Sequence, residues 1–101
     1  MAMQTETTPF DPADYLSADK GQLDLLRDAF ASGNTAFIVN AIGAVARARN
    51  VSELARETGL TRAGLYKAFG PEGDPKLSTV IGVLEALGFK LSVALESRPA
   101  A

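Results

Sequence analysis

The sequence predicts an all-α fold, and three observations point to it. Apolar residues recur every three or four positions over most of the chain, which is the spacing of an amphipathic helix. Residues that cap helices, together with glycines that end them, divide the chain into short helical segments. Of the 101 residues, 47% are hydrophobic and 22% are charged, which is a globular composition. We therefore expect one compact domain with appended segments.

Residues 1–33 are expected to form an N-terminal tail and a helical appendage. A short helix can begin at Asp11–Pro12, where Asp11 is the cap and the missing N–H of proline costs nothing. After a turn through Tyr15–Leu16, Ser17 can cap a second helix that ends at Gly33. The apolar face of this second helix consists of Leu23, Leu26 and Phe30.

Residues 34–88 are expected to form the main domain. Asn34 or Thr35 opens its first helix, in which Arg47 and Arg49 occupy the last turn. Positive charge there complements the helix dipole, and either side chain could also reach a phosphate. The core face of this helix combines residues at helical spacing with their neighbours: Ile38, Ile42 and Val45, beside Phe37 and Ala41.

The run Val51–Phe69 predicts two short helices that cross through a tight turn, a helix-turn-helix. Ser52 can cap the first helix, Gly59 can take the left-handed conformation that ends it, and Thr61 can cap the second. The crossing point is occupied by the small Ala55, and the apolar contacts come from Leu54, Leu60 and Leu65. The exposed residues of the second helix suit a DNA groove, and they are Thr61, Arg62, Ala63, Gly64, Tyr66 and Lys67.

The last helix of the domain follows the loop Gly70–Pro75, which is a loop by composition. Lys76 ends the loop and could touch a DNA backbone. Ser78 can cap the helix and Gly88 can end it. The expected buried stripe consists of Val80, Ile81, Leu84 and Leu87.

Residues 89–101 are expected to form a single β-strand and a frayed end. Apolar and other residues alternate over Phe89–Leu95, which is the period of a half-buried strand. A lone strand leaves unpaired backbone groups and needs a partner. That partner is either the segment Thr7–Phe10, a second copy of the chain or a different protein; alternatively, the segment is an amphipathic extension that covers the core.

The composition excludes several classes of function. The chain contains no cysteine and no histidine, so disulfides, zinc sites with these ligands, thiol nucleophiles and histidine bases are excluded. We therefore expect no enzyme and no cofactor or metal. No apolar run is long enough to span a bilayer, and the N-terminus lacks the features of a secretory signal, so we expect a cytoplasmic protein without membrane contact.

The net charge of −2 is unevenly distributed along the chain. Residues 1–46 carry six acidic and two basic residues, residues 47–76 carry four acidic and six basic residues, and the remainder is neutral. The positive charge therefore coincides with the helix-turn-helix, as in a DNA-facing module joined to an acidic segment that meets a basic protein. A split this small also arises by chance.

From Phe10 to Leu95 the chain resembles the addiction-module antidote proteins, which are HigA-like antitoxins of bacterial toxin–antitoxin operons. The matching stretches are Phe10–Leu16, Ala46–Phe69, Gly73–Val80 and Leu84–Phe89. The resemblance implies a lambda-repressor-like helical bundle with an Xre-type helix-turn-helix. It also implies a homodimer that binds operator DNA in its own promoter, and neutralisation of a RelE-like ribonuclease toxin.

Two departures from the family pattern concern the contacts to DNA. Ser52 stands where many lambda-repressor-like domains have a glutamine that contacts both phosphate and base, and Ala63 stands where relatives are often charged. Base readout would therefore depend on Arg62, Tyr66 and Lys67 in the major groove. Phosphate contacts would come from Ser52, Lys67 and Lys76.

The sequence is also compatible with two alternative functions. The chain could be a solitary helix-turn-helix transcriptional regulator without a toxin. It could also be a protein-interaction module that keeps the fold only as a scaffold. The sequence specifies neither the operator nor the toxin, nor the surface that the toxin binds.

Overall fold

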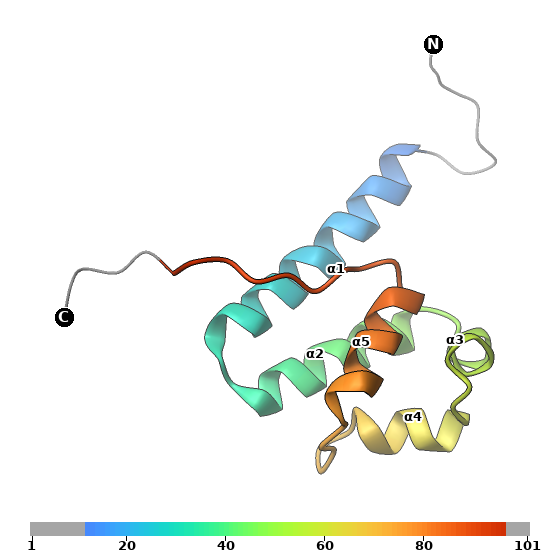
Figure 1. Ribbon diagram of the computed structural model, residues 1–101. Coiled ribbons are helices and arrows are strands. Elements are labelled where there is room, and N and C mark those ends of the chain that lie inside the picture. The colour runs from blue at the N-terminus through green and yellow to red at the C-terminus, as the bar shows by residue number, and fades with distance from the viewer. Residues whose placement is uncertain (1–11, 97–101) are drawn as a thin grey trace.

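The computed structural model describes residues 12–96, with side chains from residue 20 onward, and is all-helical over this range (Figure 1). The predicted all-α class is therefore confirmed for the described residues. None of the helices described within them is long and apolar enough to cross a membrane. The helices are α1 (Pro12–Ser32), α2 (Thr35–Ala48), α3 (Val51–Thr58), α4 (Arg62–Ala68) and α5 (Leu77–Ala86).

Helix α1 is longer than the sequence suggested. It runs without interruption from Pro12 to Ser32, so the predicted turn through Tyr15–Leu16 and the second helix start at Ser17 are wrong. Neither glycine nor proline occurs over residues 13–20, around the expected turn, so nothing there stops a helix that has already begun. The helix ends at Gly33 as predicted, with a φ of 69°. The proposed Asp11 cap lies outside the described residues.

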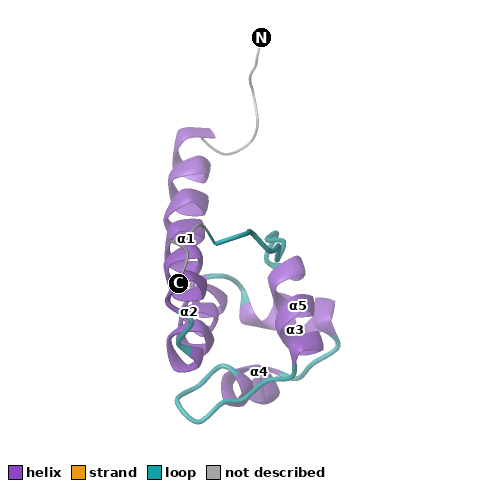
Figure 2. Cartoon of the chain, turned by 60° about the vertical axis from the view of Figure 1, so that its left-hand side comes forward, coloured by secondary structure: helices purple, strands orange, loops and turns teal. Residues whose placement is uncertain are grey.

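Helices α1 and α2 form an antiparallel pair that lies side by side in both ribbon views (Figures 1 and 2). Asn34 caps α2 as predicted, because its side chain accepts a hydrogen bond from the Phe37 N–H at 3.0 Å. The N-terminal part of α1 extends past the other helices. The pair therefore supplies one wall of the core and leaves part of α1 without a neighbouring helix.

The core lies where α2 meets α3, α4 and α5. Ile42, Val45 and Val83 are its most completely buried large side chains. Gly43 allows α4 to approach α2 closely, since a methyl group at this position would meet the Phe69 carbonyl oxygen. The buried residues are all apolar, and they are Leu26, Ala29, Val39, Ala41, Ile42, Val45, Ala46, Leu54, Ala55, Leu65, Phe69, Val83, Leu84 and Leu87.

Helix α3 begins earlier than predicted. Asn50 is its cap, with extended backbone angles and a side chain that accepts from the Glu53 N–H at 3.1 Å, so the predicted cap at Ser52 is wrong. The two predicted ends of the turn between α3 and α4 are confirmed. Gly59 ends α3 in the left-handed conformation, with a φ of 77°, and Thr61 caps α4 by accepting from the Gly64 N–H at 2.9 Å.

Helix α5 also begins differently. Lys76 occupies the capping position without a side-chain hydrogen bond, and the predicted cap Ser78 lies inside the helix. The buried stripe is rotated from the prediction, because Val83 is fully buried whereas Ile81 is 37% exposed. Gly88 follows the helix end with a φ of 94°, as predicted.

The segment Phe89–Leu95 is not a strand in the single chain, so the prediction of a strand formed within this chain is wrong. Alternation alone cannot form a strand without a neighbouring strand edge, and residues 12–96 contain none. The suggested partner Thr7–Phe10 lies outside the described residues. Phe89 and Leu91 instead pack against the core.

Arg49 holds the start of this segment in place. Its guanidinium donates to the Gln22 side-chain oxygen at 3.0 and 2.6 Å and to the Leu87 carbonyl at 3.0 Å. It also lies 5.8 Å from the centre of the Phe89 ring, a cation–π distance. The prediction that Arg49 could reach a phosphate is therefore wrong, because this group links α1, α2 and the end of α5.

Candidate functional site

The predicted site residues of α4 share one exposed surface, which we call the α4 face. It consists of Thr61, Arg62, Ala63, Gly64, Tyr66 and Lys67, all of which are exposed. Leu65, 3% exposed, and Phe69, 2% exposed, anchor the same helix in the core. Because two buried side chains fix the inner side of α4, its outer side is presented in one orientation.

The α4 face is basic and carries no acidic group. Arg62 and Lys67 are its charged residues, and Glu57 and Glu72 are the acidic residues that flank it in the sequence. Tyr66 is 44% exposed and adds a phenol ring and a hydroxyl group. The face can therefore donate hydrogen bonds to anionic oxygens and pack against flat or apolar groups.

The first turn of α4 is low in profile, and this follows from its capping geometry. A Cβ atom at Gly64 would lie 3.0 Å from the Thr61 hydroxyl oxygen, which is tighter than an ordinary contact. The cap therefore favours the absence of a side chain at Gly64, and Ala63 beside it carries only a methyl group. Arg62 is the one long side chain at the N-terminal end of α4. A flat partner surface can therefore approach this end of the helix closely.

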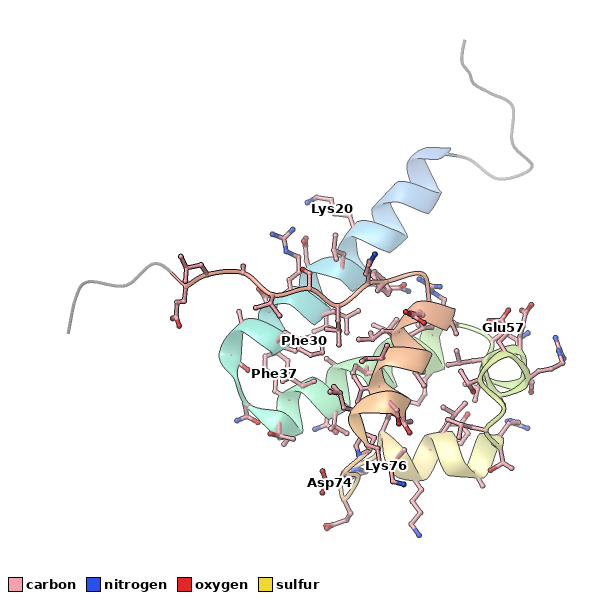
Figure 3. All side chains as sticks on the ribbon, in the orientation of Figure 1. Lys20, Phe30, Phe37, Glu57, Asp74 and Lys76 are labelled. Carbon is pink, nitrogen blue, oxygen red and sulfur yellow. The ribbon has the colours of Figure 1, made fainter. Side chains whose placement is uncertain are left out.

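Ser52 and Lys76 come from outside α4. Ser52 is exposed in the first turn of α3, where Asn50 has taken over the capping role and leaves the serine hydroxyl out of the cap. Lys76 is exposed at the start of α5, at the end of the molecule that α4 occupies (Figure 3). The structure thus brings Lys76 to the same end as the α4 face.

Arg47 is a further basic residue near the α4 face, and its position in α2 favours the phosphate contact that the sequence allows. It is exposed in the last turn of α2, and it lines a small hollow together with Tyr66 and Gly43. The position lies four residues after Gly43, so both residues share one side of α2. Close packing at Gly43, which the sequence did not reveal, is what places this guanidinium beside the α4 face.

The nearby acidic residues lie in two places, and Asp74 is at the same end of the molecule as Lys76 (Figure 3). Glu57 and Glu85 line a groove of about 510 Å³ between α3 and α5, outside the α4 face. Among the residues described, no three acidic side chains come together as metal ligands would. The predicted acidic segment depends mainly on Glu6, Asp11, Asp14 and Asp19, whose side chains lie outside the described part.

Comparison with known proteins gives two matches over most of the chain. A family model described as "Probable addiction module antidote protein" matches residues 6–95. An uncharacterized protein of Haemophilus influenzae is 36% identical over 91 residues, which cover 90% of this chain and 94% of the relative. No solved structure matches the chain. The length of the family match, which includes every described helix, shows that the chain belongs to the addiction module antidote protein family.

Proposed function

We propose that this protein is the antitoxin of a type II toxin–antitoxin module. In this role it binds operator DNA as a dimer, represses its own operon and neutralises a RelE-like ribonuclease toxin. Membership of the antidote family supports the antitoxin role. It also favours this role over that of a solitary transcriptional regulator, because an antidote acts against a toxin.

The observation that carries the DNA-binding part is the α4 face. A short helix is anchored by Leu65 and Phe69, capped by Thr61 and joined through Gly59 to α3, as in a helix-turn-helix. Its outer surface is basic, free of acidic groups and low in profile at the N-terminal end. A recognition helix enters the major groove with its N-terminal residues at the base edges.

Each exposed side chain then has a role in the complex. Arg62, in the first turn, donates two hydrogen bonds to guanine O6 and N7, which is the commonest specific contact in the major groove. Tyr66 packs on a thymine methyl group or donates to a phosphate. Ser52, Lys67 and Lys76 contact phosphates and set the register. Arg47, beside Tyr66, adds a phosphate contact from α2.

A dimer is part of this proposal for a geometric reason. The α4 face offers few side chains for base readout, so one copy contacts too few base pairs for strong selectivity. Two copies related by a two-fold axis read a palindrome with half-sites about one helical turn apart.

The DNA-binding part is tested with Arg62→Ala. A duplex that covers the promoter of the operon serves as the specific probe, and a shuffled duplex of equal length serves as the non-specific probe. Arg62→Ala should weaken specific binding by ~1–3 kcal/mol in a gel-shift titration, with little effect on the shuffled duplex. Arg56→Ala is the matched control, because it removes the same charge from an exposed position on α3. Unchanged discrimination by Arg62→Ala would remove this residue from base readout.

The toxin-binding part needs a separate experiment. The chain is co-expressed with the product of the reading frame adjacent to its gene, and an affinity tag on one partner is used to recover the other. Co-purification, together with relief of growth arrest, supports the antitoxin role. DNA binding without a toxin partner would favour the solitary regulator, and toxin inhibition without DNA binding would favour the scaffold.

A further inference from the structure

The segment Lys90–Glu96 is an extended stretch of chain with an exposed apolar side. Val93 and Leu95 are each 98% exposed, although the same alternation places Leu91 half-buried against the core. No backbone hydrogen bond joins Lys90–Leu95 to another described residue. Within the described part of the chain, Lys90–Leu95 therefore offers backbone N–H and C=O groups without backbone partners together with fully exposed apolar side chains, which is what a strand presents when its partner is absent.

The start of the segment is fixed, and this limits where a partner can lie. Arg49 holds the Leu87 carbonyl and lies over the Phe89 ring, and the Phe89 N–H donates to the Leu84 carbonyl at 2.8 Å. The segment then passes across α1 (Figure 1). Because its beginning is tethered to the core, a strand that pairs with it is held at a defined place on the molecule.

The sequence of the segment is complementary to itself in the antiparallel direction. If two copies pair with Val93 opposite Val93, Leu91 of each copy lies opposite Leu95 of the other. On the other face, Lys90 lies opposite Glu96, so opposite charges meet at both ends. One register thus satisfies the apolar face and the charged face together.

The same register places an apolar side chain beside a groove that the structure contains. A groove of about 170 Å³ lies beside Leu91, and its walls include Leu23, Leu26 and Phe30. Leu23 is 39% exposed in the single chain. Since opposite residues of an antiparallel pair project to the same face, Leu95 of a second copy lies next to Leu91 and can enter this groove. A two-stranded ribbon alone is marginal in water, and this burial adds the packing that it lacks.

We propose that Lys90–Glu96 pairs with the same segment of a second copy as a two-stranded antiparallel ribbon centred on Val93, with Leu95 of each copy in the groove beside Leu91 of the other. The proposal rests on the dimer of the proposed function and names its surface. It also explains why the segment alternates in sequence but is not a strand in the single chain.

Single-cysteine variants of the full chain test both the contact and its register. The chain contains no cysteine, so Val93→Cys and Ala94→Cys each introduce one thiol at an exposed position. In the proposed register Val93 of one copy lies opposite Val93 of the other, whereas Ala94 lies opposite Ser92. Val93→Cys should form disulfide-linked dimers about tenfold faster than Ala94→Cys in a mild oxidant, because only the former brings two Cβ atoms within bonding range.

Charge reversal provides a second, independent measurement. Lys90→Glu should weaken self-association about threefold or more in sedimentation equilibrium, because like charges then lie opposite each other. Adding Glu96→Lys to the same chain should restore it. Both positions are exposed, so the fold is expected to survive, and circular dichroism checks this.

Several results would overturn the proposal. A wild-type chain that sediments as a monomer at the concentrations used for DNA binding would do so, as would equal cross-linking of the two cysteine variants. If the backbone amides of Lys90–Glu96 were protected from hydrogen exchange only when a toxin is bound, the segment would be a toxin-binding surface instead. Self-association is measured without DNA, and its outcome is therefore independent of promoter binding. A chain that dimerises through this segment but does not bind the promoter would contradict the proposed DNA binding and still support the ribbon.

Discussion

Asn50 and Ser52 are both suitable helix caps, and backbone geometry decides which of them caps α3. A capping residue needs extended backbone angles so that its side chain can reach back to the N–H groups of the first turn. Asn50 has these angles, with φ −87° and ψ 103°, whereas Ser52 already lies within the helix. The same replacement occurs in α5, where Lys76 holds the capping position and Ser78 lies inside.

We therefore expect Asn50→Ala to destabilise the protein by ~1 kcal/mol, because the Glu53 N–H loses its side-chain partner. Ser52→Ala is the control. It removes a hydroxyl that does not cap the helix and introduces a better helix former, so the free energy of unfolding should change by less than about 0.5 kcal/mol. Urea unfolding at matched protein concentration measures both. Equal losses for the two variants would mean that Ser52 shares in the cap.

Individual residues also show how far the sequence specifies the site. The exposed set on α4 could be predicted because capping and helical spacing are local properties, and Gly59 and Thr61 fix both ends of the turn. The role of Arg49 could not be predicted in this way. Its partners Gln22 and Leu87 are distant in sequence, and only the packing of α1 and α5 against α2 brings them together.

At the scale of the elements, α4 depends on how closely it approaches α2. Gly43 lies at this contact, where an added Cβ would meet the Phe69 carbonyl oxygen and lie 3.1 Å from the Arg47 side chain. Gly82 in α5 is also helical but has nothing within 4 Å of such an atom. The two glycines therefore differ in surroundings rather than in backbone conformation.

Gly43→Ala should destabilise the protein by ~1–3 kcal/mol, because backbone must move to admit the methyl group into a packed contact. Gly82→Ala should stabilise it by ~0.5–1 kcal/mol, because alanine restricts the unfolded chain and favours the helix. Thermal and urea unfolding show whether each variant lowers or raises the free energy of unfolding. A neutral Gly43→Ala variant would show that α4 can move away from α2 without loss.

Elements that depend on local signals were predicted correctly, whereas elements that depend on tertiary neighbours were not. Helix ends at Gly33, Gly59 and Gly88 were predicted because a glycine with positive φ is a local signal. The strand over Phe89–Leu95 was not formed because a strand needs a neighbour, which alternation cannot supply. The stripe of α5 was rotated because both Ile81 and Val83 fit helical spacing, and only tertiary packing selects between them.

At the scale of the whole molecule, two exposed lysines lie at different ends of the fold. Lys20 lies on α1, where it forms an exposed ion pair with Asp24 at 3.7 Å, and Lys76 lies at the end that α4 occupies (Figure 3). Exposed pairs of this kind contribute little to stability, so Lys20 is a suitable neutral reference. If DNA binds at the α4 face, only the lysine at that end should release counterions from the duplex.

The salt dependence of DNA affinity should therefore differ between variants of these two lysines. Each phosphate contact contributes about 0.9 to the slope of log K against log salt, so Lys76→Ala should reduce the slope by about 2 for a dimer, one contact from each copy. Lys20→Ala removes the same charge and should leave the slope unchanged. Gel-shift titrations over a range of salt concentrations measure both variants on the promoter duplex. A reduction of about 1 would indicate that one copy binds at a time, and equal slopes for the two variants would place the DNA away from Lys76.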